Sequence, residues 1–119
     1  DPIRTNAVFM VGFVISIAAA ALQWGADRQA HRFRRENPGK VCRTGLWKCS
    51  RHPNYRGEIL MWWGVGIMYV SLVQSHWFTL FGAVAVTLLF LLVSIPMMEK
   101  RELSRKPEYA EYKKVTRML

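Results

Sequence analysis

The chain has 119 residues, of which 51% are hydrophobic, and it carries 17 Lys and Arg against 8 Asp and Glu. This length suffices for one small domain. The charges fall in blocks between long apolar stretches, which is typical of a membrane protein and argues against nucleic acid as a partner. We therefore predict an all-α integral membrane protein: a single domain with about three transmembrane helices, a basic cytoplasmic loop and a C-terminal amphipathic tail.

The first apolar window, residues 6–26, is long enough for one span, since a helix needs about twenty apolar residues to cross the hydrocarbon core. The helix is expected to continue beyond the membrane, where polar side chains at helical spacing share one face. These are Gln23, Asp27, His31 and Arg34. The run Asn37-Pro38-Gly39 should end the helix. On physical grounds alone this face is most simply a solvated one with weak ion pairs.

The loop 27–58 contains a short apolar centre around Trp47, which is expected to lie at the lipid headgroup level. Cys42 and Cys49 have a spacing that matches no common zinc pattern, and they lie on the side where thiols stay reduced. We therefore expect free thiols and no metal.

The loop ends in the block Ser50-Arg51-His52-Pro53-Asn54-Tyr55-Arg56-Gly57-Glu58. Pro53 can begin a helix as its first residue. The N–H groups at such a helix start attract anions, so phosphate or carboxylate binding is plausible here. Glu58 lies just inside the apolar run that follows, where an acid is costly unless it is paired or lines a cavity. Arg51 is a candidate partner.

Residues 59–98 carry no formal charge and are long enough to cross a bilayer twice. The polar cluster Gln74-Ser75-His76 predicts a turn, which gives a helical hairpin with spans at about 59–73 and 77–98. Gly64 and Gly66 would permit close helix approach. The tail, residues 99–119, is charged and is expected to form an amphipathic surface helix.

Three spans place both basic blocks, the loop and the tail, on the same side of the membrane. The positive-inside rule then puts them in the cytoplasm or matrix, with the N-terminus outside. Topology signals and attraction to anionic membrane lipids account for most of the positive charge.

Two strings carry a family resemblance. The first is Thr44-Gly45-Leu46-Trp47, followed by the block from Ser50 to Glu58 and by Trp62-Trp63-Gly64; the second is Ile95-Pro96-Met97-Met98-Glu99-Lys100-Arg101 with Lys106-Pro107-Glu108-Tyr109-Ala110-Glu111-Tyr112. Together they resemble the carboxy-terminal half of the steroid 5-alpha-reductase superfamily, in particular its bacterial-type branch. The resemblance covers nearly the whole chain.

The resemblance implies a helical membrane domain whose cytoplasmic loops bind NADPH. By matching position, Gln23, Asp27 and Arg34 would contact the adenine nucleotide, with Gln23 standing where the steroid reductases have asparagine. Asn54 would lie near the nicotinamide amide. The remaining cofactor-binding residues implied are Arg51, His52, Tyr55, Glu58, Arg101, Tyr109 and Tyr112.

Two alternatives stay open. Isoprenylcysteine and phospholipid methyltransferases share the Arg-His-Pro-x-Tyr motif and use S-adenosylmethionine, although they usually carry Glu-Glu where this chain has Glu99-Lys100. In either enzyme a lipophilic substrate would enter from the bilayer.

Full family members have further spans before this region that supply much of the substrate pocket and the proton donor, so the catalytic residues stay unassigned. We also expect a chain that begins at Asp1 to be processed or a fragment. A reductase-like domain that serves as a structural subunit of a larger membrane complex is therefore the second alternative.

Overall fold

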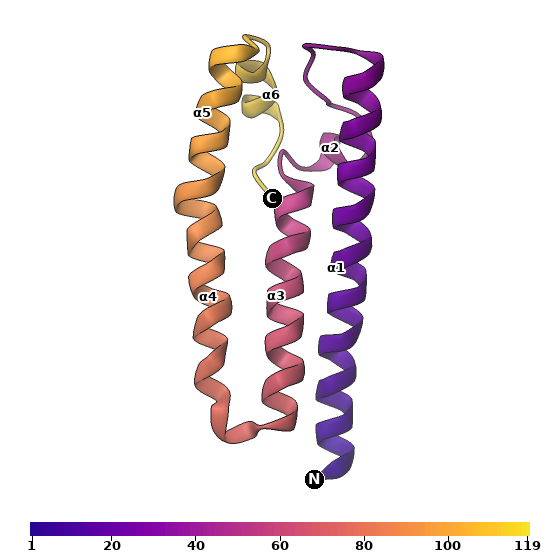
Figure 1. Cartoon of the computed structure of the whole chain (residues 1–119), viewed down its shortest axis with the longest axis vertical. Coiled ribbons are helices and arrows are strands. Elements are labelled where there is room, and N and C mark those ends of the chain that lie inside the picture. The colour runs from indigo at the N-terminus through magenta and orange to yellow at the C-terminus, as the bar shows by residue number, and fades with distance from the viewer.

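The computed structural model describes residues 1–119 and contains helices only (Figure 1). A long helix is followed by an antiparallel helical hairpin, and short elements gather at one end of the bundle. In chain order the elements are α1 (Pro2–Glu36), α2 (Leu46–Cys49), α3 (Pro53–Leu72), the 3₁₀ turn η1 (Gln74–Thr79), α4 (Leu80–Leu89), the π-helical turn η2 (Phe90–Ser94), α5 (Ile95–Arg105) and α6 (Tyr109–Val115).

Helix α1 begins and ends at recognisable signals. The Asp1 carboxylate accepts a hydrogen bond from the Ile3 N–H at 3.1 Å, and Pro2 occupies the first turn. The helix ends at Glu36, and Asn37 caps it through a backbone bond to Phe33. Gly39 then reverses the chain at a φ of 79°. The predicted extension of this helix beyond the apolar window, and its end at residues 37–39, are confirmed.

Helices α1 and α3 pack in close contact through glycines. A Cβ at Gly64 would lie 2.8 Å from the Gly12 carbonyl oxygen and would also overlap the Ser16 hydroxyl. A Cβ at Gly57 would lie 2.8 Å from the Ala19 carbonyl oxygen. Only glycine allows the two backbones to approach this closely. The close approach predicted at Gly64 is confirmed.

The predicted hairpin is also confirmed, with its turn at η1 (Figure 1). The Trp63 indole N–H of α3 donates to the Thr87 hydroxyl of α4 at 2.8 Å, which joins the two arms. Helices α4 and α5 form one continuous rod through η2. Because Pro96 has no N–H to bond the Leu92 carbonyl, the backbone opens into a π-turn just before it.

Two helical segments, Pro2–Glu36 and Gln74–Arg105, are long and apolar enough to cross a membrane. Helix α3 lies between them in sequence and carries Arg56 and Glu58 near its start. That α3 forms a third crossing stays a prediction, as do the orientation of the bundle and the cytoplasmic position of the loop and tail.

The short elements cover the end of the bundle where α1 ends and α3 begins. Trp47 of α2 is buried against Ala26 and Ala30 of α1, and its indole N–H donates to the Ala26 carbonyl at 3.0 Å. Trp47 is therefore covered by the protein rather than exposed to lipid, and its one polar atom is satisfied there; its level relative to a membrane stays a prediction. The tail is not a surface helix alone, since Tyr109 and Tyr112 of α6 pack on Val41 of the loop.

Candidate functional site

The Glu99 carboxylate organises the polar centre of the molecule. Its Oε2 atom lies 3.0 Å from Arg51 Nε and 3.1 Å from His52 Nε2, and it accepts a hydrogen bond from the Tyr109 hydroxyl at 3.1 Å. All four residues are buried. They come from the loop before α3, from α5 and from α6. We call these four residues the Glu99 cluster.

The Arg51 side chain makes two polar contacts, and its backbone makes a third. Its Nη1 donates to the Lys113 carbonyl of α6 at 2.8 Å, whereas its Nε is close to Glu99 as an ion pair without the alignment of a hydrogen bond. The backbone N–H of Arg51 also donates to the Arg117 carbonyl at 2.9 Å. The guanidinium is thus fixed between α5 and the tail.

His52 is fully enclosed, and burial lowers its pKa below the ordinary value, against the opposing effect of the Glu99 carboxylate. The imidazole is therefore neutral at pH 7. A carboxylate can only accept, so the proton lies on Nε2 and is donated to Glu99. The Nδ1 atom is then a bare acceptor, and it has no hydrogen-bond partner.

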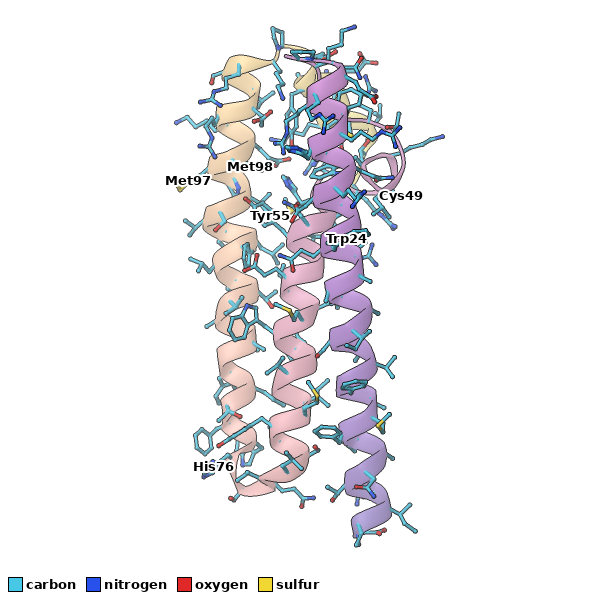
Figure 2. The ribbon with its side chains drawn as sticks, turned by 45° about the vertical axis from the view of Figure 1, so that its right-hand side comes forward. Trp24, Cys49, Tyr55, His76, Met97 and Met98 are labelled. Atoms are coloured by element: carbon cyan, nitrogen blue, oxygen red, sulfur yellow. The ribbon has the colours of Figure 1, made fainter.

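A second buried acceptor follows on the first turn of α3. The Oδ1 atom of Asn54 is buried and also has no partner. The next residue on this turn is Tyr55, whose ring centroid is 5.5 Å from that of His52 and 5.1 Å from that of Phe90 in the π-turn. Figure 2 shows Tyr55 directed into the space between the helices. Buried polar atoms are rarely left unpaired, so these two acceptors mark a site for a donor.

A small pocket of about 90 Å³ opens beside the Glu99 cluster. Positive side chains from separate segments meet there, and the floor is apolar and aromatic. The cations are Arg34 of α1, Lys40 and Arg51 of the loop, and Lys106 after α5. Of these, Lys106 has an acidic partner in Glu102 at 3.3 Å, and Arg51 in Glu99. A pocket of this size accepts a phosphate-sized group but not a whole dinucleotide, which needs several hundred Å³.

Tyr112 locks the tail onto the loop. Its hydroxyl donates to the Trp47 carbonyl at 2.5 Å and is 3.1 Å from the Ser50 carbonyl. Burial raises the pKa of Tyr112, and burial together with the nearby Glu99 carboxylate raises the pKa of Tyr109. Both phenols therefore stay protonated well above neutral pH and act as hydrogen-bond donors.

The predicted site residues fall into three groups. Arg34, Arg51, Tyr109 and Tyr112 line the cationic pocket. A second group lies along the start of α3 and consists of His52, Asn54, Tyr55 and Glu58. Gln23 of α1 lies against this helix start, since a Cβ added at Gly57 would be 3.0 Å from the Cβ of Gln23. Asp27 and Arg101 are exposed on α1 and α5.

Arg51 was a candidate partner for Glu58 in the sequence, but in the structure its ion pair is with Glu99. Glu99 itself was missed as a site residue. The signal was present: an acid directly after a long uncharged run is subject to the same cost that drew attention to Glu58. Lys40 and Lys106 were missed because nothing local in the sequence indicates that they meet.

Taken together, the helices and the buried polar cluster define a helical membrane-type protein with a candidate ligand site at one end of its bundle. Residues 2–116 match the model of the DUF1295 family, described as "Protein of unknown function (DUF1295)", and the chain belongs to this family. It is a membrane family related to steroid 5-alpha-reductase-like proteins. No curated protein and no solved structure matches the chain.

Proposed function

We propose that this chain is the cofactor-binding part of a membrane oxidoreductase that uses NADPH to reduce a carbon–carbon double bond conjugated to a carbonyl in a lipid. One observation carries the proposal: two buried acceptors without partners, His52 Nδ1 and Asn54 Oδ1, at the start of α3. The motif resemblance and the family assignment support the same class of protein.

Two parts of such a cofactor match groups that the chain presents, namely its carboxamide and its phosphate. A nicotinamide carboxamide offers two N–H donors, and the two acceptors at the start of α3 each need one. The cationic pocket offers Arg34 and Lys40 to a phosphate, with Lys106 and Arg51 nearby. Gln23 and Asp27, one turn apart on α1, would contact the adenine nucleotide.

When bound, NADPH supplies a hydride. The chain's own residues would bind and orient the cofactor. Glu99 keeps the proton of His52 on Nε2, so that Nδ1 would be available to accept a hydrogen bond from the carboxamide. Tyr55 packs between His52 and Phe90 and forms an aromatic wall on the side of the apolar helices. A lipophilic substrate would approach from that side, within the bilayer.

The test is a titration of NADPH into the purified protein in detergent, read by thermal shift and by nucleotide fluorescence. Saturable binding is expected, and Asn54→Leu should weaken it about tenfold or more, since a lost hydrogen bond and a misfit donor together cost on the order of 1–3 kcal/mol. Asn6→Leu is the matched control, because Asn6 is exposed near the opposite end of α1.

Three results would contradict the proposal. The first is no response to NADPH. The second is saturable binding of S-adenosylmethionine that NADPH does not displace, which would favour the methyltransferase alternative. The third is stoichiometric co-purification with other membrane subunits by a protein that binds no nucleotide, which would favour a structural subunit.

A further inference from the structure

A groove on the outer surface of α1 lies apart from the site described above. It is lined by Trp24, Gly25, Arg28, Gln29, Arg32 and Leu46. None of these residues belongs to the Glu99 cluster or to the cationic pocket. Trp24 is 65% exposed although it is the largest side chain in the groove. The exposure of so large an apolar side chain near the end of an apolar helix suggests that something other than protein covers it.

The groove lies across the end of the apolar window. Trp24 is among the last residues before Asp27, the first charge after the window. Tryptophan is enriched at the membrane–water interface, where its ring sits at the headgroup level. Figure 2 places Trp24 on α1 at nearly the level of Tyr55. With α1 as a span, the groove would extend from the lipid tails to the headgroups.

Positive charge increases along the groove in the direction away from the span. The Arg28 guanidinium lies 5.1 Å from the centroid of the Trp24 ring and has no carboxylate partner. Arg32 follows one turn later and pairs only with the exposed Glu36 at 3.4 Å. A second depression shares Arg28 and Arg32 and continues to Arg35. An apolar end toward the bilayer and a cationic end away from it match the shape of an anionic phospholipid.

The far wall of the groove is built by the loop. The Gln29 side chain accepts a hydrogen bond from the Leu46 N–H at 3.0 Å, which fixes α2 beside α1. Gly45 adopts a φ of 61°, and a Cβ there would overlap the Gln29 amide. Leu46 is thereby held next to Gly25, where it provides the apolar wall.

We propose that this groove binds an anionic phospholipid, with Arg28 and Arg32 holding the phosphodiester and with Trp24 and Leu46 contacting the glycerol and acyl region. Basic residues directly beyond the end of a membrane helix attract anionic headgroups. The inference does not depend on the proposed NADPH site.

The test uses the whole chain in nanodiscs of phosphatidylcholine with and without phosphatidylglycerol, with retained lipid measured by native mass spectrometry. The protein should retain phosphatidylglycerol in preference to phosphatidylcholine. The double variant Arg28→Gln/Arg32→Gln should lose about twenty-fivefold in affinity, at about fivefold for each arginine near the surface. The control Lys100→Gln/Arg105→Gln removes the same charge from exposed positions on α5 and should change retention little.

Equal loss in both double variants would show general attraction to negative membranes and would overturn the proposal. So would displacement of the lipid by inorganic phosphate at a comparable concentration, because a free anion would then be the ligand. NADPH titration of Arg28→Gln/Arg32→Gln separates the two hypotheses, since unchanged nucleotide binding with lost lipid is the expected combination.

Discussion

Arg51 and Glu99 form a buried ion pair between the loop that precedes α3 and the helix that returns from the hairpin, with Nε and Oε2 3.0 Å apart. Only 8% of the Arg51 side chain and 4% of the Glu99 side chain are exposed. When one member of such a pair is removed, the other becomes an uncompensated buried charge. The geometry of the site and the stability of this end of the bundle therefore depend on the same contact.

Glu99→Gln should lower the free energy of unfolding by about 3–5 kcal/mol, because it strands the Arg51 charge. The measurement is an unfolding titration with SDS in mixed micelles. Glu102→Gln is the matched control: its carboxylate pairs with Lys106 at 3.3 Å in a more exposed position, and its loss should cost about 1 kcal/mol or less. Equal costs for the two variants would contradict a buried ion pair.

Acid should destabilise the protein through His52. Its pKa in the folded state is lowered from the ordinary 6.5, so below pH 6.5 the unfolded chain binds a proton that the folded chain does not. The free energy of unfolding should then fall as pH drops below 6.5, with a slope of up to roughly 1.4 kcal/mol per pH unit. Unfolding titrations from pH 7.5 downward measure it. His52→Gln should remove this slope, and a slope that survives the substitution would assign it to another group.

Tyr112→Phe should cost roughly 1–3 kcal/mol, since it leaves the carbonyls of Trp47 and Ser50 without their shared donor. Thermal unfolding in detergent measures the change. Tyr69→Phe removes a hydroxyl that bonds His76 at an exposed position and serves as the control. If Tyr112→Phe and the unmodified protein unfold at the same temperature, the attachment of the tail to the loop does not depend on this hydroxyl.

Gly64→Ala should destabilise the packing of α1 on α3 by about 1–3 kcal/mol, because the new methyl group meets the backbone of Gly12. Gly82→Ala, within α4, has nothing within 4 Å of the added Cβ and should be neutral or slightly stabilising. SDS unfolding of both variants gives the comparison. A stable Gly64→Ala protein would mean that the two helices can move apart.

Much of the fold could be predicted from local signals. Uncharged windows located the long helices, Pro53 located the start of α3, and residues 37–39 located the end of α1. These features depend on properties of neighbouring residues along the chain. The uncharged window 59–98 predicts two crossings in addition to the first helix, and of the three predicted spans the segments Pro2–Glu36 and Gln74–Arg105 contain helices that are long and apolar enough to cross a membrane.

The site was only partly predictable, because its contacts join segments far apart in sequence. Motif resemblance drew attention to Arg51, His52 and Tyr109, but nothing local indicates that all three meet at Glu99. The burial of Trp47 against α1 has the same origin. An aromatic residue in a basic loop resembles an interface anchor until the backbone acceptor at Ala26 is seen.

The late position of Glu99 and Tyr109 in the chain has a consequence for biosynthesis. Chains emerge from the ribosome from the N-terminus onward. Arg51 and His52 therefore emerge well before Glu99, which pairs with both of them. During that interval the loop must stay hydrated, with both groups in contact with water. The polar centre can close only after the hairpin has returned, so a nascent chain stalled within α4 would hold the first helices of the bundle without a ligand site.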